Sequence, residues 1–321
     1  MQRSTILTIA VILSSLWACQ NNAPAPAANQ TSAPSIDSLF AEYHRERLPM
    51  FPLEATFAGD TRYNDLLPNT ISQAHRNTLR EFYGKFKARL QGFNRAELNE
   101  NQRTSYDILL WECDITLEDL QFPTELMPIN QFDCLPLMMG QLAGGTSGQP
   151  FKTVQDYDNW LRRVDGFVMW CDTAIANMRR GMTAGYVLPK PLIEKMVPQM
   201  ASFDHGPVEK HLYYSPITLM PKEIASADRE RLTTAYRQMV NDKIIPVYQR
   251  MHKFVKEEYL PAGRASSGIS DVPNGVGYYA HQIHTYTTTH MNADEIFNLG
   301  EQEVARLSLE MEKVKAQVGY K

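Results

Sequence analysis

The sequence lacks the short motifs that mark the commonest hydrolase and nucleotide-binding sites. None of its eight histidines is followed by a glutamate, so the HExxH zinc-binding motif is absent. No GxSxG segment marks a nucleophilic serine. Gly275, Gly277 and Ala280 spell GxGxxA, but the residues before them read as a turn, whereas a dinucleotide-binding fingerprint needs a preceding β-strand. Motifs alone therefore identify no chemistry.

An excess of charge of one sign and long apolar runs are also missing. The net charge is −4, which gives no electrostatic support for a nucleic-acid partner, and we expect none. No segment after residue 19 approaches the ~18 uninterrupted apolar residues that a membrane helix needs. Cysteine is scarce, and the three cysteines after Cys19 allow at most one disulfide at spacings that fit no zinc site. Cys113 and Cys171 fall in apolar helical stripes and are expected to be buried.

The first nineteen residues look like a bacterial lipoprotein signal. Arg3 supplies the positive charge, an apolar run follows at residues 6–13, and Leu-Trp-Ala-Cys at residues 16–19 is lipobox-like. Cleavage before Cys19 and acylation of its thiol would tether the chain to a membrane by lipid. An ordinary secretory peptide cleaved elsewhere is the alternative. We predict a signal peptide at residues 1–18, lipidation at Cys19 and a location in the cell envelope, at the outer membrane or facing the periplasm.

Composition then divides the mature chain in two. Residues 19–35 are rich in Ala, Pro, Asn and Gln and carry no charge, so they bury too little apolar surface to order themselves and read as a disordered tether. Residues 36–321 carry helical periodicity without convincing alternating strands or repeats, which predicts an all-α domain built as a multi-helix array. The expected helices begin after Ser35, run over 72–90, 99–120 and 153–181, start again near Pro189, run over 226–259 with a break at Pro246, and begin once more at Asn292.

Two segments interrupt this pattern. Residues 122–150 hold four prolines and four glycines and are expected to form an ordered, irregular excursion that lines a cleft. Residues 273–290 hold the densest set of polar aromatic and imidazole groups. If this segment is helical, His281, His284 and Thr288 share one face. The histidine pair lacks a third zinc ligand in the local spacing, so we expect no metal ligand in this chain. A hydrogen-bonding face turned to a cleft and a polar face packed on a neighbouring loop both remain open.

Several segments in a fixed order carry a family resemblance. They are PLEATFAG at residues 52–59, GMTAGYVLP at 181–189, YLP at 259–261, PNGVGYYAHQIHTYTTT at 273–289 and MNADEIFNLGEQEVARLSLEM at 291–311. Together they resemble the N-terminal half of the bacterial family called domain of unknown function 885, over residues 36–321. The YYA to TTT stretch with its following helix is the most specific part.

The resemblance implies an all-helical scaffold similar to zinc metallopeptidases of the carboxypeptidase Taq kind. There, two histidines and a downstream glutamate of a C-terminal HExxH half would hold zinc, and the motif's glutamate would activate water. That half is absent here, so zinc is expected only through it, no catalytic residue is expected in this chain, and this chain alone should be inactive. Tyr278, Tyr279, His284 and Thr288 match the family pattern and are the candidates for hydrogen bonding to a peptide or small amide substrate.

Two other functions stay open. In the first, the chain is a noncatalytic envelope lipoprotein that binds a ligand in a retained cleft. In the second, it is a purely structural tether. The second leaves the YYA to TTT segment without a purpose.

Overall fold

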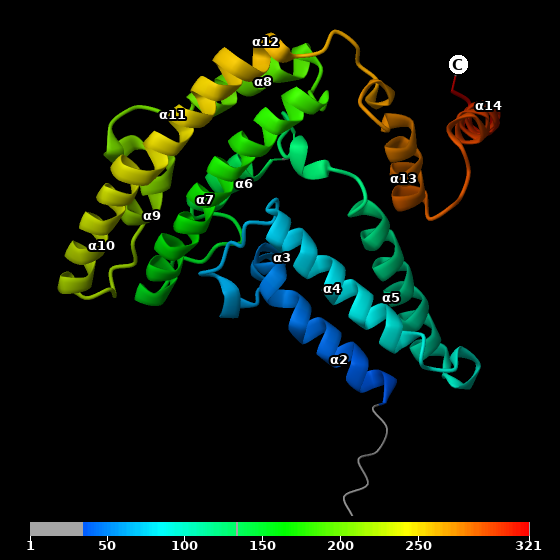
Figure 1. The fold of residues 1–321 in the computed structure, drawn as a ribbon, viewed down its shortest axis with the longest axis horizontal. Helices are drawn as coiled ribbons and strands as arrows, with labels where there is room; N and C mark the ends of the chain where they lie inside the picture. Colours follow the sequence, from blue (N-terminus) through cyan, green and yellow to red (C-terminus); the bar gives the residue numbers. More distant parts are fainter. Residues whose placement is uncertain (1–34, 133, 321) are drawn as a thin grey trace, which may run out of the picture. The chain divides into compact units, whose positions relative to one another are not determined.

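The computed structural model describes residues 35–132 and 134–320, so the signal peptide, Cys19 and most of the tether lie outside the described residues. Residues 42–321 form one compact unit, and the chain divides from it after Ala41. Among the described residues the secondary structure is helical, apart from one isolated bridge between Pro189 and Arg264 (Figure 1). The all-α prediction is confirmed. None of the helices in residues 35–132 and 134–320 combines the length and the hydropathy that a membrane span requires.

The helix starts follow the predicted caps. Ser72 Oγ accepts a hydrogen bond from the backbone N–H of His75, and capping boxes begin the helices after Asn99, Thr153 and Asn292. The helices are α2 (Ile36–Arg47), α3 (Pro52–Phe57), α4 (Gln73–Leu90), α5 (Glu100–Asp119), α6 (Leu135–Ala143), α7 (Val154–Ala184), α8 (Lys190–Ala201), α9 (Ser215–Thr218), α10 (Ser226–Met239), α11 (Ile245–Phe254), α12 (Leu260–Ala262), α13 (Gly275–Thr287) and α14 (Ala293–Gln317).

Two boundary predictions were wrong. The 122–150 segment is not irregular throughout, because α6 lies within it. Pro136 stands in the first turn of α6, where a missing N–H costs nothing, so a residue that reads as a breaker begins a helix. The long helix α7 also runs past Gly181 and ends at Gly185, which has a φ of 84°. A Cβ on Gly181 would meet the carbonyl oxygen of Leu126 at 2.6 Å, so this glycine serves close packing.

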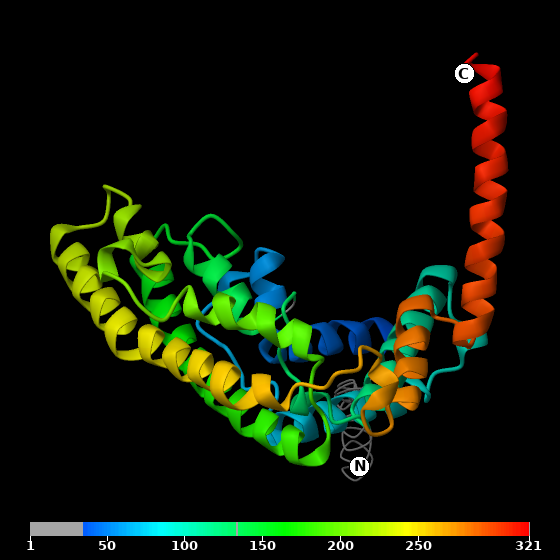
Figure 2. The ribbon, with the colours of Figure 1, turned by 90° about the horizontal axis from the view of Figure 1, so that it is seen from above.

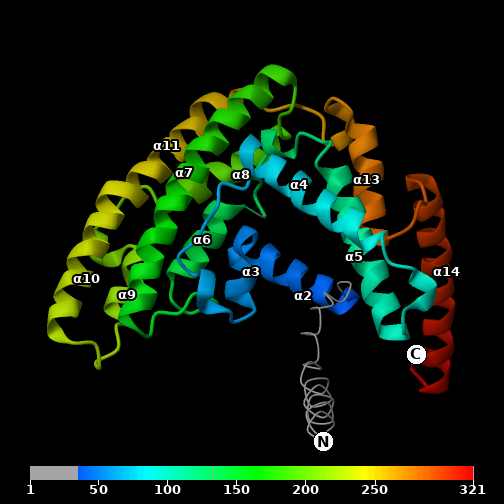
Figure 3. The same cartoon turned by 60° about the horizontal axis from the view of Figure 1, so that its bottom comes forward.

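The core is organised around α7. Trp160, Val164 and Phe167 are fully buried on its inner face, which packs against α10 and α11 (Figure 3). Burial of each such side chain stabilises the fold by about 1.5–3 kcal/mol. The α10–α11 helix divides near Pro246, as predicted, through a π-helical turn at Val240–Ile244. In such a turn the backbone hydrogen bonds span five residues instead of four. This change comes directly before Pro246, which has no backbone N–H to donate.

The cysteines and α14 occupy opposite environments. Cys113 and Cys171 are buried, as predicted, and Cys134 is buried as well. By contrast α14 buries none of its residues, and Figure 2 shows it apart from the other helices along most of its length. Its apolar side chains therefore lie exposed.

Candidate functional site

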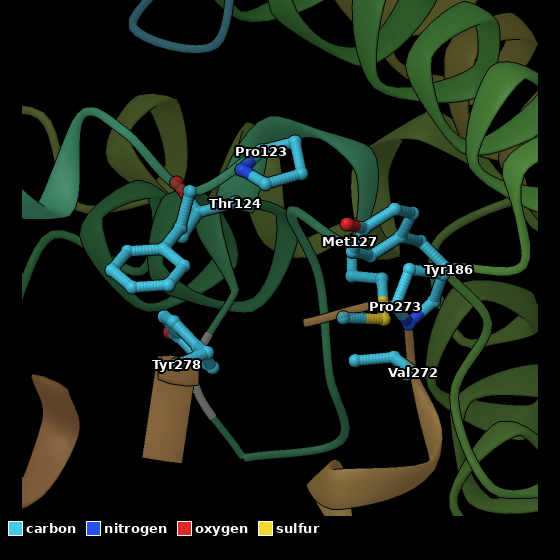
Figure 4. Close-up of a pocket in the computed structure, with 8 residues that line it drawn as sticks. Pro123, Thr124, Met127, Tyr186, Val272, Pro273 and Tyr278 are labelled. Carbon is cyan, nitrogen blue, oxygen red and sulfur yellow. The ribbon is translucent and has the colours of Figure 1, made fainter. Parts of the chain in front are cut away.

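An apolar pocket of about 100 Å³ opens beside the first turns of α13. Tyr278 lies on one side of it and Tyr186 on the other, with Met127 and Pro273 near Tyr186 (Figure 4). A closed apolar cavity of about 150 Å³ holds benzene, so this smaller pocket, which is open on one side, has room for one branched side chain or for part of a ring. Its full lining is Phe122, Pro123, Thr124, Met127, Tyr186, Val272, Pro273 and Tyr278.

Glycine at the start of α13 brings two of the pocket's segments together. A Cβ on Gly275 would lie 1.9 Å from the carbonyl oxygen of Ile269, so only glycine lets the 269–271 turn pack this closely on the helix. Asn274, directly before it, adopts a left-handed φ of 53°. The residues before the GxGxxA motif thus form a tight turn, as predicted, and the motif's first glycine serves this packing.

A buried arginine holds another segment of the pocket. Arg76 of α4 donates to the carbonyl oxygens of Leu120 at 3.0 Å and Phe122 at 2.7 Å, and to Thr124 Oγ1 at 3.1 Å. Its Nε lies 3.3 Å from Glu125 Oε2, and both side chains are more than nine-tenths buried. This guanidinium holds the chain at three alternate residues between the end of α5 and the turn at Thr124–Leu126.

His281 fastens α13 to the end of α5. The imidazole is 2% exposed, and its ring stacks on Phe122 at 5.2 Å between centroids. Its Nδ1 lies 3.4 Å from Glu118 Oε1, and its Nε2 lies 3.3 Å from Asp119 Oδ1. A protonated imidazole would pair with both carboxylates, whereas a neutral one donates to a single partner. The face of α13 that carries His281 is thus packed on a neighbouring element.

His284 lies at the edge of the same cluster. Its Nδ1 is 3.6 Å from Glu118 Oε2, and its ring lies 4.5 Å from that of His290. Among residues 35–132 and 134–320, no three His, Cys, Asp or Glu side chains have the arrangement of a metal site.

The structure separates the four candidate residues. Tyr278 lines the pocket and its ring contacts Phe122 at 5.3 Å; burial, with the nearby charge of Asp119, raises the pKa of its hydroxyl. Tyr279 is 49% exposed on the outer side of α13, and His284 is half-buried beside the acidic pair. Thr288 ends the helix with a left-handed φ of 56°, so it does not continue the histidine face, contrary to expectation. Only Tyr278 reaches the pocket.

Sequence reasoning missed most of the pocket. Met127 and Tyr186 lie 59 residues apart in the sequence. Tyr186 belongs to the GMTAGYVLP segment of the family resemblance but was not singled out, and Met127 stands in no motif. The signal that was available is the expectation that the segment beginning at residue 122 lines a cleft, and the structure places residues 122–127 on the pocket.

The fold and the pocket define an all-helical domain with one aromatic-lined recess beside α13. The model of the family described as bacterial protein of unknown function (DUF885) matches residues 52–321, and the chain belongs to this family. The crystal structure of "the putative lipoprotein from Colwellia psychrerythraea" is similar, with a TM-score of 0.73 and 17% identity over 89% of this chain and 51% of that chain. The chain thus spans about half the length of that structure, and the likeness shows the fold. No curated protein matches.

Proposed function

We propose that this chain is the N-terminal, substrate-positioning part of a lipid-anchored peptidase or related amide hydrolase of the cell envelope. One observation carries the proposal: the aromatic pocket is built against the PNGVGYYAHQIHTYTTT segment, the most specific part of the family resemblance. Concave sites with an apolar lining and a few polar groups are the usual places for small ligands and substrates. Tyr278 would contact the substrate directly in the pocket, whereas Tyr279, His284 and Thr288 do not line it and could contact only parts of a longer substrate that lie outside it.

The surface of α14 supports a larger whole. Its apolar residues follow a heptad pattern, in which spacings of three and four residues alternate. Each of them is at least half exposed. These residues are Phe297, Val304, Leu307, Met311, Val314 and Val318. Such a stripe is the seam of a helix that packs on another helix, and the solved relative has about as much chain again to supply one.

Zinc enters this proposal only through polypeptide beyond these residues. The described side chains do not supply its ligand set, since no cluster of three suitable groups exists among them. Bound zinc would polarise a carbonyl or activate water. The part proposed for this chain is to bind and orient the substrate, which requires no ligand to the metal.

The anchor is a separate element of the proposal. The similar solved structure is described as a lipoprotein, which supports the proposed location of this chain in the cell envelope. Replacing Cys19 with alanine should move the protein from the membrane fraction to the soluble fraction, while Asn21→Ala in the adjoining tether should leave it at the membrane. Membrane association of both variants would contradict lipidation at Cys19.

A noncatalytic binding lipoprotein is the second candidate. It is favoured by the fact that all eight lining residues of the pocket lie within the described chain, so binding requires no further domain. Reading the coding sequence past Lys321 separates the two. An in-frame continuation bearing HExxH supports the peptidase, and a stop codon directly after Lys321 favours the binder.

Metal analysis tests the division of labour. The purified chain should contain no stoichiometric zinc after dialysis, whereas a longer product with the HExxH half should contain one per chain and cleave peptides in a chelator-sensitive way. Tight binding of one zinc by the present chain would overturn the assignment of the metal to the other half.

A further inference from the structure

We infer that the pocket beside α13 is a subsite for one uncharged, bulky apolar side chain, either aromatic or branched, of a peptide ligand. The inference rests on the proposed function in taking a peptide as the ligand. Its basis is the size, the charge and the tyrosine hydroxyls of the pocket.

Size limits the ligand at both ends. The pocket holds about 100 Å³, so glycine or alanine would leave most of it to water, and a two-ring side chain would not fit. A leucine side chain would fill it, and a phenylalanine ring would enter it with one edge left outside; burial would gain at most about 1.5–3 kcal/mol, the value for a completely buried side chain. Rings that contact one another at Phe122 and Tyr278 provide a flat wall for such a side chain.

Charge excludes the other large side chains. None of the eight lining residues carries a formal charge. The nearby Arg76 is paired with Glu125 and donates to backbone carbonyls, and the carboxylates of Glu118 and Asp119 face His281. An ionised side chain would therefore lose its hydration in the pocket without gaining a partner.

Two of the lining residues, Tyr186 and Tyr278, carry hydroxyl groups that could bond to the ligand backbone. The hydroxyls of Tyr186 and Tyr278 form no hydrogen bond with another residue in the described part of the chain, and the two tyrosines stand on opposite sides of the recess (Figure 4). A tyrosine presents an apolar ring and a polar tip, so it can pack on a side chain while its hydroxyl meets an amide. This combination favours a peptide over a hydrocarbon ligand.

Methyl NMR on the purified chain tests the inference. With ¹³C-methyl methionine, the Met127 signal, assigned by its loss in Met127→Leu, reports occupancy of the pocket. N-acetyl-L-phenylalaninamide and N-acetyl-L-leucinamide should shift it saturably. N-acetyl-L-lysinamide and the anionic N-acetyl-L-glutamic acid α-amide should bind at least about tenfold more weakly. Equal binding of either charged probe would overturn the inference, as would shifts confined to other methionines.

A matched pair of variants locates the binding. Val272 lines the pocket, so Val272→Phe should fill it and weaken the phenylalanine probe at least about tenfold. Val276 is 71% exposed on α13, and Val276→Phe should leave binding unchanged. If Val272→Phe does not fold, Tyr186→Ala, which removes one wall, should weaken the same probe at least about fivefold. Unchanged binding in the folded pocket variant would contradict the site.

The outcome is separable from that of the proposed function. Probe binding requires neither zinc nor a longer polypeptide. If the probes bind selectively but the longer product has no peptidase activity, the peptidase proposal is refuted and the subsite inference stands. If the longer product is active but the probes bind without selectivity, the subsite inference is refuted and the peptidase proposal stands.

Discussion

Replacing Arg76 with methionine tests how the pocket segment is held. The variant keeps an unbranched apolar stem but removes the guanidinium that contacts the carbonyls of Leu120 and Phe122, and it leaves Glu125 only 8% exposed without its cation. Removing one partner of a buried ion pair typically costs about 3–5 kcal/mol, because the remaining charge stays buried. We expect the free energy of unfolding to fall by about this amount.

Urea denaturation followed by far-ultraviolet circular dichroism measures the effect. Arg80→Met is the matched control, since Arg80 lies one turn further along α4, is exposed, and donates to the Leu120 carbonyl at 2.8 Å. It should cost no more than about 1 kcal/mol. The double variant Arg76→Met/Glu125→Leu should recover much of the loss, because no buried charge remains. Equal losses in the two arginine variants, or no recovery in the double variant, would refute the reasoning.

Three further predictions concern other parts of the domain. Gly166→Ala should lower the free energy of unfolding by several kcal/mol, because the added Cβ would meet a backbone carbonyl oxygen at 2.3 Å. Gly84→Ala, where the added Cβ meets open space, should raise the free energy of unfolding by about 0.5–1 kcal/mol. Urea titration measures both changes. Burial raises the pKa of Cys113 to about 12, so its thiol should react with Ellman's reagent at pH 8 only after unfolding, and rapid reaction of the native protein would contradict this. Burial raises the pKa of Asp204, but hydrogen bonds from His205 and His252 lower it below the ordinary 3.8. The stabilising contribution of this carboxylate should therefore be present above that pH and be lost as the pH falls through the lowered pKa. Urea titration below about pH 4 should show this loss in the native protein and not in Asp204→Asn, and the same pH dependence in both would contradict it.

Helix beginnings were predictable because capping is local. The side chains of Ser72, Asn99, Thr153 and Asn292 accept backbone hydrogen bonds within three residues, so the pattern is complete in the sequence. Helix ends were predictable only in part: α4 and α5 end within a residue of the expected positions and α10–α11 divides near Pro246, but the end of α7 was placed too early. Gly181 looks like a stop, but the approach of another backbone decides its role, and that approach exists only in the folded chain.

The site shows the same limit more strongly. Tyr278 could be named from the family resemblance. Tyr186 lies in another segment of that resemblance, GMTAGYVLP, and Met127 lies in none, so nothing in the sequence showed that these two residues meet Tyr278 at one pocket. Likewise, His281 meets Glu118 and Asp119 only because α13 packs on the end of α5. Local spacing contains no trace of these partners.

The left-handed conformation of Thr288 has a consequence for engineering this protein. A β-branched residue in that region costs the fold of order 1–3 kcal/mol, which glycine would not. Thr288→Gly is therefore an easy gain in thermal tolerance at a position that also belongs to the family motif. Selecting variants by melting temperature alone would therefore favour Thr288→Gly. That choice would also remove a hydroxyl that belongs to the family motif and to the candidate site residues.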